Sequence, residues 1–412
     1  MSQFKKSFIW NTIGTSFNAF NSLFFMIIVT RINGVENAGI FTLAFSTACI
    51  MYVIGLYAGR IYQVTEPDQT ITNKDYIINR IITTSLMIIL VAFFCIIKGY
   101  TLYKATIFIL LTIYKALEAF CDTFYGILQK NEKLDKVGKS LVLKSIISVI
   151  LFMLVDYATK NLVFTIIAII ITNILITIFY DIKNSKEFIE TKVKYNKNNI
   201  KKIFKLGFFT FIISFLGMYI LNAPKYSIDN YLTESYQTIF GIIVMPATVM
   251  GLVAQFLIHP YLNKIMDVYE DRNLKALKKM IFKLVLIIGI FGMLASILAY
   301  LLGPEVLGGI YGIDLNLYRV NLVIIIIAST LYTVGVIYSS VLTTVRDTFS
   351  QFIIYIIISI FAFIISNLFT QFYELNGATY AYLSIMFLQF SIYIVYSNIK
   401  LKRIFKEDRV KI

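Results

Sequence analysis

Long apolar stretches separated by short, unequally charged gaps are the feature that most constrains the fold of this chain. At 1.5 Å per residue, a helix of about 20 residues crosses a hydrocarbon core about 30 Å thick. Stretches of that length lie at about 8–30, 38–59, 76–97, 105–128, 138–157, 162–181, 206–231, 237–259, 281–302, 319–342, 351–370 and 378–398. The sequence therefore predicts an all-α membrane protein with twelve transmembrane helices and both termini on one side.

The distribution of lysine and arginine between the gaps predicts the orientation of these helices. Most of the 38 Lys and Arg residues fall in the gaps on the side of the termini, and Lys115 lies within a stretch. The opposite gaps hold only Arg31, Lys98, Lys104, Lys160, Lys225 and Arg319. The positive-inside rule then places both termini in the cytoplasm. The net charge of +15 is explained by these loops and by their contact with anionic lipid headgroups, so we expect no nucleic-acid partner.

The longest polar gap divides the chain into two halves. It predicts an N-terminal six-helix bundle over 1–182, a basic cytoplasmic linker over 183–205, and a C-terminal six-helix bundle with a basic cytoplasmic tail over 206–412. Both halves begin with paired lysines, at residues 5–6 and 201–202, which favours a parallel repeat. The outer loops are all short and leave no room for a folded domain.

Polar residues inside the predicted spans are the candidate site residues, because they must face another helix or water. In the first span Asn11, Thr15, Asn18 and Ser22 lie within about 60° of one another on a helix. This stripe indicates either hydrogen bonding between helices or the wall of a hydrophilic lumen, in which Asn11 and Asn18 would bind substrate.

The fourth span carries three ionisable residues, Lys115, Glu118 and Asp122, on one helical face near mid-membrane. Each costs about 2.5–3.5 kcal/mol at the bilayer centre on insertion scales, so we expect all three to contact protein or water. One interpretation is a structural ion pair of Lys115 with Glu118. The other is a cavity cation for an anionic substrate, with Glu118 and Asp122 as acids that titrate or bind a coupling ion.

Further charges lie near the outer ends of spans. Lys225 and Asp229 share a face of the seventh span beside Pro224, which bends a helix and marks either a gate hinge or a helix end. There Lys225 is a candidate substrate-binding cation and Asp229 a candidate ion-coupling acid. Arg31 and Arg319 would either line the rim of a cavity or anchor their helices at the interface.

No motif indicates an enzyme, a cofactor or a metal site. Gly138-Lys139-Ser140 resembles the end of a phosphate-binding loop, but Lys133 stands where that motif requires glycine. The single histidine, His259, excludes a two-histidine metalloprotease motif. The three cysteines lie within predicted spans at unrelated spacings, which predicts neither disulfides nor metal ligands.

Four motifs along the chain carry a resemblance to a known family. They are Arg31-Ile-Asn-Gly-Val-Glu-Asn-Ala-Gly-Ile-Phe-Thr-Leu-Ala44, Tyr125-Gly-Ile-Leu-Gln-Lys130, Asn222-Ala-Pro-Lys-Tyr-Ser-Ile-Asp229 with the following Ile239-Phe-Gly and Met245-Pro246, and His259-Pro-Tyr-Leu262. Together they resemble polysaccharide-unit flippases of the multidrug/oligosaccharidyl-lipid/polysaccharide (MOP) exporter superfamily. The resemblance covers nearly the whole chain.

This resemblance implies two six-helix bundles around a central cavity that opens alternately to either side of a bacterial cytoplasmic membrane. The implied cargo is a polyprenyl-diphosphate-linked oligosaccharide for capsule, exopolysaccharide or O-antigen, with membrane lipids and glycan polymerase machinery as partners. A cationic cavity would hold the diphosphate. Branch members that carry the peptidoglycan precursor have an arginine-rich first span, whereas this chain has Ala19 and Phe25 near the matching places, which disfavours that cargo.

Two alternatives remain. A cation-coupled multidrug extruder shares the architecture but would need unpaired acids in its cavity, whereas both mid-span acids here lie beside a lysine. A membrane glycan polymerase or ligase belongs to a different class and would need larger outer loops.

Overall fold

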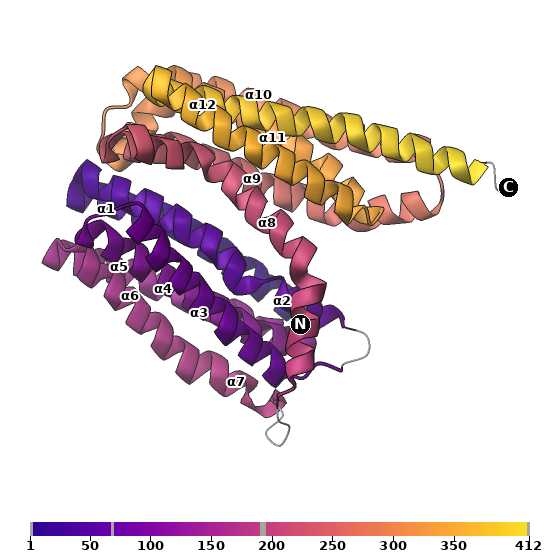
Figure 1. The fold of residues 1–412 in the computed structure, drawn as a ribbon, viewed down its shortest axis with the longest axis horizontal. Coiled ribbons are helices and arrows are strands. Elements are labelled where there is room, and N and C mark those ends of the chain that lie inside the picture. The colour runs from indigo at the N-terminus through magenta and orange to yellow at the C-terminus, as the bar shows by residue number, and fades with distance from the viewer. Residues whose placement is uncertain (1–2, 67–69, 190–194, 410–412) are drawn as a thin grey trace. The chain divides into compact units, whose positions relative to one another are not determined.

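The chain is helical throughout the part that the structure describes. A computed structural model describes residues 3–66, 70–189 and 195–409, and no β-strand occurs within these ranges (Figure 1). The chain forms two compact units, Met1–Met218 (unit 1) and Tyr219–Ile412 (unit 2). The boundary falls inside a helix, later than the predicted start of the C-terminal bundle at residue 206. The described parts of the predicted linker 183–205 belong to unit 1.

The helices follow one another with short connections. Unit 1 contains α1 (Gln3–Leu56), α2 (Gly59–Thr65), α3 (Asn73–Ile97), α4 (Leu102–Lys130), α5 (Leu134–Thr159), α6 (Leu162–Ile176), the π-helix η1 (Thr177–Ile182), α7 (Lys183–Ser185) and the 3₁₀-helix η2 (Lys186–Phe188). Helix α8 (Lys197–Tyr231) crosses from unit 1 into unit 2. Unit 2 continues with α9 (Glu234–Glu270), α10 (Leu274–Tyr311), the 3₁₀-helix η3 (Asn316–Tyr318), α11 (Arg319–Thr344) and α12 (Thr348–Arg409).

The two longest helices, α1 and α12, are each interrupted by one residue with a positive φ angle. In α1 the break is at Gly34, with φ 83°, a conformation that glycine adopts without steric cost. In α12 it is at Glu374, with φ 52°. Each break lies between two of the predicted spans, so α1 and α12 each contain two of the predicted stretches.

Among the described residues, eight continuous helical segments are long and apolar enough to cross a membrane. They are Lys5–Thr65, Asn73–Ile97, Leu134–Thr159, Leu162–Phe188, Lys197–Tyr231, Leu274–Tyr311, Asn316–Thr344 and Thr348–Phe405. Helices α4 and α9 coincide with predicted stretches but are not among these eight, and α4 carries the charges of the fourth span. The chain is therefore a multi-pass, all-helical membrane protein, while the count of twelve spans stays a prediction.

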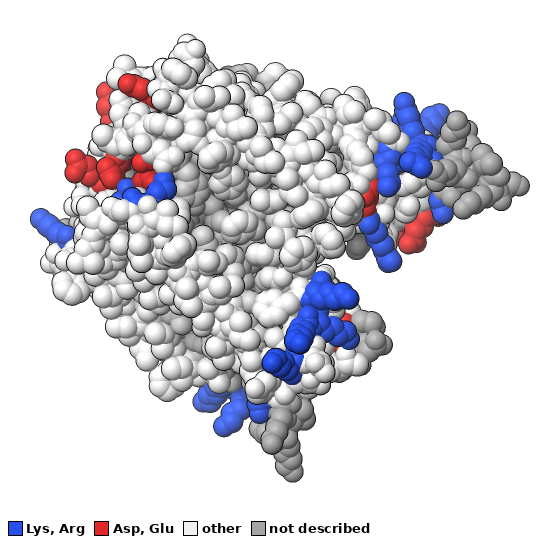
Figure 2. Space-filling view, in the orientation of Figure 1, with Lys and Arg blue, Asp and Glu red and all other residues white. Residues whose placement is uncertain are grey.

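The outer surface fits a lipid environment. Many large apolar side chains away from helix ends are exposed, such as Met293 at 59% and Phe363 at 61%. Figure 2 shows Lys and Arg side chains gathered near helix ends, with a wide surface free of charged side chains between them. This pattern is expected where helix middles contact hydrocarbon and helix ends contact headgroups.

Segments predicted for the termini's side meet at one end of unit 1. The contacts there join Gln3 with Asp135, Asn73 with Phe188, Asp75 with Asn196 and Asn199, and Lys202 with Thr70. At the other end Asn33 donates to Asp156 at 2.5 Å, and Tyr103 donates to Asn37 at 2.9 Å. Within unit 1 these segments thus meet in two groups, while the side of the membrane on which each group lies stays a prediction.

Candidate functional site

Helix α4 is the centre of the polar interior of unit 1. It carries charged or polar side chains on two faces and contacts α1, α2, α3, α5 and α6. Three groups of residues meet it along its length. We call them the pair cluster (Lys115 and Glu118), the arginine cluster (Arg60, Arg80 and Asp122) and the lysine cluster (Lys144, Asp181, Cys121 and Tyr125).

In the pair cluster the Lys115 Nζ donates to Glu118 Oε2 at 2.7 Å, and the two side chains are 13% and 15% exposed. Three aromatic rings surround the ammonium group: those of Phe45, Tyr52 and Tyr114, with centroids at 4.9, 5.7 and 5.6 Å. Ring faces attract cations, so Lys115 is held by a carboxylate and by π-systems together. The ion pair that the sequence left as one of two interpretations is therefore present, and it retains a small exposed surface.

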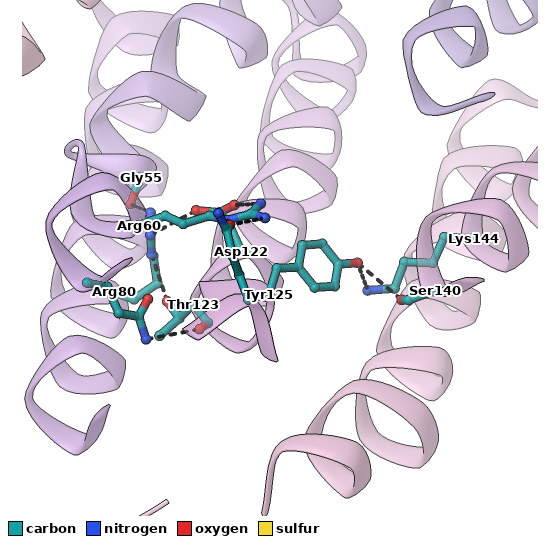
Figure 3. Close-up of polar contacts among 10 residues, drawn as sticks. Gly55, Arg60, Arg80, Asp122, Thr123, Tyr125, Ser140 and Lys144 are labelled. Carbon is teal, nitrogen blue, oxygen red and sulfur yellow. Dashed lines mark hydrogen bonds and ion pairs between the residues drawn. The ribbon is translucent and has the colours of Figure 1, made fainter. Parts of the chain in front are cut away.

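Asp122 does not join the pair cluster, although the three charges share a helical face. Seven residues separate it from Lys115, which is about 10 Å along a helix. Its carboxylate contacts Arg60 at 3.0 Å and Arg80 at 3.2 Å instead. Asp122 is thus the shared acid of two arginines, which come from α2 and α3 (Figure 3).

The two arginines of this cluster differ in exposure. Arg80 is 3% exposed and donates to the carbonyl of Gly55 at 2.7 Å and to Thr123 Oγ1 at 2.9 Å. Arg60 is 28% exposed and donates to Gln129 Oε1 at 2.8 and 3.0 Å. Two guanidinium groups share one carboxylate, so the arginine cluster carries a net charge of +1, and Arg60 is its accessible cation.

A strained turn brings Arg60 into place. Tyr57 and Ala58 have φ angles of 42° and 55°, which cost of order 1–3 kcal/mol each for residues other than glycine. The turn directs α2 back toward α4, where a side chain at Gly126 would place its Cβ 2.1 Å from Gln63 Oε1. The strained turn and the small size of Gly126 together allow α2 to pack against α4. This packing places Arg60 beside Asp122.

The lysine cluster lies on the neighbouring face of α4 and is fully enclosed. Lys144 of α5 donates to Asp181 at 2.5 Å and to Cys121 Sγ at 3.0 Å. It also donates to Tyr125 at 3.1 Å (Figure 3). Both charged side chains are buried. Asp181 belongs to the π-helix η1, which widens the turn there, and such turns are frequent at functional sites.

Four residues of these clusters were not predicted as site residues, because they were counted with the polar gaps: Arg60, Arg80, Lys144 and Asp181. A signal was present for two of them. Arg80 and Lys144 lie inside the apolar stretches 76–97 and 138–157, where a charge requires a partner. Arg60 lies just beyond its stretch, and no sequence pattern predicts the turn that carries it back into the bundle.

The remaining candidates of unit 1 lie on α1. Asn11 and Asn18 are half-buried, and Thr15 between them donates to the backbone carbonyl of Asn11 at 2.8 Å. Arg31 is exposed just before the break at Gly34.

The candidates of unit 2 lie near helix ends. Lys225 and Asp229 are half-buried in the part of α8 that follows Pro224. Arg319 begins α11, is ion-paired with Glu305 of α10, and donates to the carbonyl of Tyr300 at 2.5 Å. These contacts fasten α11 to α10, and the choice between a cavity rim and an interface anchor for Arg319 stays open.

The chain matches no protein-family model. It is similar to the capsular polysaccharide biosynthesis protein CapF of Staphylococcus aureus, with 27% identity over 329 residues, which cover 79% of this chain and 81% of CapF.

Solved structures with a similar fold are transporters. An inward-facing multidrug resistance MATE family transporter of the MOP superfamily superposes with a TM-score of 0.73 and 13% identity, covering 97% of this chain and 99% of the other. A MOP superfamily transporter from Pyrococcus furiosus gives 0.63 and 12%, covering 97% and 95%. A Vibrio cholerae MATE transporter gives 0.66 and 11%, covering 98% of each chain. The resemblance to the MOP superfamily that the sequence motifs indicate is therefore confirmed at the level of the fold.

Proposed function

We propose that this chain is a flippase that moves polyprenyl-diphosphate-linked oligosaccharide units across a bacterial cytoplasmic membrane by alternating access. It would cross the membrane twelve times, with both termini in the cytoplasm and a central cavity between two bundles. One observation carries the proposal: similarity to a capsular polysaccharide biosynthesis protein extends over most of both chains, in a chain with a transporter fold.

The charge balance of the three clusters on α4 supports an anionic cargo. The carboxylates of Glu118, Asp122 and Asp181 are each ion-paired with a lysine or arginine. Arg60 adds a positive charge that Asp122, already shared with Arg80, does not neutralise. In a low-dielectric interior an uncompensated cation attracts an anion strongly, and a diphosphate supplies the bidentate oxygens that a guanidinium group fits.

The mechanism that follows assigns different roles to the two exposed cations. Arg60 would bind the diphosphate, and Lys115 would exchange its bond to Glu118 for a bond to a phosphate oxygen. Glu118, once released, becomes the acid that takes up a proton or another coupling cation. The carrier lipid stays in the bilayer while the two units exchange access.

A complementation strain that lacks its own flippase tests the role of Lys115. We expect Lys115→Gln to reduce surface polysaccharide at unchanged protein level. The double variant Lys115→Gln with Glu118→Gln is the matched control, because it removes the acid that Lys115 neutralises. Polysaccharide that stays low in both variants is the expected result, because the proposal gives both residues a role in transport. Recovery in the double variant would mean that Lys115 only neutralises Glu118, and it would remove Lys115 from the cargo site.

A multidrug extruder is the second candidate, because a structurally similar transporter is described as a multidrug resistance protein. The pairing of Glu118, Asp122 and Asp181 with basic residues disfavours it, since a cationic drug needs an acid without a basic partner beside the cavity. Unchanged drug susceptibility after deletion of the gene, together with loss of surface polysaccharide, would support the flippase. Increased susceptibility with intact polysaccharide would support the extruder.

A glycan polymerase or ligase is disfavoured by the transporter fold. Purified protein in liposomes that contain lipid-linked repeat units would move them without joining them. Formation of longer glycans in that preparation would contradict the proposal.

A further inference from the structure

The interior of unit 2 differs chemically from that of unit 1. Among the described residues of unit 2, every buried polar side chain is an uncharged amide or hydroxyl group. They are Asn222, Ser227, Gln237, Thr238, Asn321, Ser329, Thr333, Gln351, Ser359, Ser366, Thr370, Thr379, Gln389 and Ser397. Most of those whose contacts are resolved are hydrogen-bonded, such as Gln351, which contacts Ser339 and Thr343.

Gln237 and Gln389 are exceptions, because neither amide has a hydrogen-bond partner among the described residues, and Gln389 lies near the middle of the second half of α12. Its side chain is 1% exposed, and neither its amide nitrogen nor its amide oxygen has a hydrogen-bond partner among the described residues. A buried amide without partners costs several kcal/mol in a bilayer, where no bulk water substitutes. The Gln389 amide therefore offers an unused donor and an unused acceptor to a ligand group that can both accept and donate hydrogen bonds.

Aromatic residues flank this amide along α12. Tyr382, Met386, Gln389 and Tyr393 recur at spacings of four, three and four residues, so they line one face of the helix. Tyr382 and Tyr393 are both buried in the core of unit 2. The ring of Tyr393 meets the ring of Tyr355, from the first half of α12, edge to face at 6.1 Å.

Helix α11 passes close to the backbone of α12 at Gln389 and Phe390. The Cβ that a side chain at Gly335 would carry lies 3.5 Å from the Cα of Phe390 and 3.9 Å from the carbonyl carbon of Gln389. Tyr332 lies one turn before Gly335 on α11 and packs against the same core, only partly buried, as is Tyr355. These two tyrosines form the edge of the cluster that reaches the surface.

We propose that Gln389, with Tyr332, Tyr355, Tyr382 and Tyr393, forms a saccharide-binding site within unit 2. A sugar ring offers hydroxyl groups, which both donate and accept, and C–H faces, which pack on aromatic rings. An amide and several tyrosines match those groups, and the absence of charge among the described buried residues selects against ions. This proposal rests on the proposed function and adds to it that the uncharged part of the cargo is recognised by unit 2.

Binding can be tested apart from transport. The probe is the oligosaccharide released by mild acid from the lipid-linked units of the strain that carries this chain, added to the purified full-length protein in detergent. We expect it to raise the melting temperature of the wild type. Gln389→Leu keeps the volume of the side chain and removes both hydrogen-bonding groups. It should raise about tenfold the oligosaccharide concentration that gives half of the full shift in melting temperature.

Two variants control the experiment. Asn321→Leu removes a buried amide that donates to Asn376 and Thr379, about 15 Å along α12 from Gln389, and it should leave the response to the oligosaccharide unchanged. Tyr332→Phe keeps the ring and removes the hydroxyl group, and it should weaken the response even if Gln389→Leu does not fold.

The outcomes separate this proposal from the proposed function. A wild-type response in both Gln389→Leu and Tyr332→Phe overturns the saccharide site, whether or not the protein flips lipid-linked units. A response of the wild type to sodium chloride, but not to the oligosaccharide, identifies a cation site and also overturns it. If the response depends on Gln389 but reconstituted protein moves no lipid-linked unit, the flippase proposal fails and saccharide binding stands.

Discussion

The two units are helical bundles with the same apolar exterior, yet their interiors carry different polar chemistry. In unit 1 the buried polar residues include the charged side chains of Asp75, Arg80, Asp122, Asp135, Lys144, Asp156 and Asp181. In the described part of unit 2 none of the buried polar side chains is charged. The packing of helices in a bundle therefore does not determine the chemistry between them.

The difference also separates two ways of stabilising a bundle. Charged clusters in unit 1 join helices through short, directional contacts that fail together when one partner is lost. Unit 2 is stabilised by apolar packing, tyrosine rings and hydroxyl groups. There we expect one substitution to lower the free energy of unfolding by less. Substitutions matched between the units should expose this contrast.

The largest effect is expected for the lysine cluster of unit 1. Lys144→Leu leaves Asp181 buried without its cation, and loss of one partner of a buried ion pair costs about 3–5 kcal/mol. We expect little folded protein by size-exclusion chromatography in detergent. The double variant Lys144→Leu with Asp181→Leu removes both charges and should recover folded protein. Equal yields of the single and double variants would contradict the assignment of this pair as a stabilising contact.

The next effect separates the two arginines that share Asp122. Arg80→Gln removes hydrogen bonds to Gly55 and Thr123 in a buried site, which we expect to destabilise unit 1 by about 2–3 kcal/mol. Arg60→Gln leaves Arg80 and Asp122 as a neutral pair, so its thermal midpoint should stay near that of the wild type. Thermal unfolding of both variants measures the contrast. A larger loss for Arg60→Gln would show that Arg60 is a structural residue rather than an accessible cation.

A smaller effect distinguishes helix crossings in the two units. In unit 1 a Cβ at Gly138 would lie 2.1 Å from the backbone oxygen of Trp10, so α1 and α5 must separate to admit it. We expect Gly138→Ala to cost about 1–3 kcal/mol. In unit 2 a Cβ at Gly335 meets its nearest neighbour at 3.5 Å, an ordinary contact, so Gly335→Ala should be neutral or slightly stabilising. Thermal midpoints test both variants, and a neutral Gly138→Ala would contradict the close crossing of α1 and α5.

The smallest effect concerns the turn between α11 and α12 in unit 2. Burial raises the pKa of Asp347, but hydrogen bonds from Ser350, Lys400 and Tyr396 outweigh it and lower the pKa below the usual value. The resulting stabilisation is complete above about pH 4, the unfolded pKa, and is lost as the pH falls through the lowered folded pKa. Because Lys400 is partly exposed, Asp347→Asn should cost only about 0–1 kcal/mol at pH 7.

Thermal midpoints measured between pH 3 and pH 7 check this prediction. The difference between wild type and Asp347→Asn should shrink as the pH falls. A difference that grows toward acid pH would contradict the lowered pKa.

The fold was largely accessible from the sequence, because hydrophobic length and charge alternation reflect the bilayer directly. The apolar stretches coincide with helices, and the gaps assigned to one side meet at one end of unit 1. The break at Gly34 falls between two predicted spans, where a glycine permits the positive φ angle. The unit boundary inside α8 could not be predicted, because a continuous helix leaves no polar gap to mark it.

The candidate site was only partly accessible. The pairing of Lys115 with Glu118 follows from helical spacing, which places residues three apart side by side. The partners of Asp122 did not follow, because Arg60 and Arg80 come from other helices, and nothing in one sequence indicates which helices pack together. The contact of Lys144 with Asp181 could not be predicted either, because these residues also lie on different helices.

Transfer of lipid-linked oligosaccharide across the membrane of proteoliposomes tests the central claim most directly, with the wild type compared with Arg60→Gln. We expect rapid transfer by the wild type. Transfer by Arg60→Gln should be at least about tenfold slower at an unchanged melting temperature, because one charge-assisted contact to a phosphate is lost. Transfer by the wild type no faster than in protein-free liposomes would contradict the flippase. A wild-type rate for Arg60→Gln would contradict the assignment of the accessible cation in unit 1 to the anionic cargo.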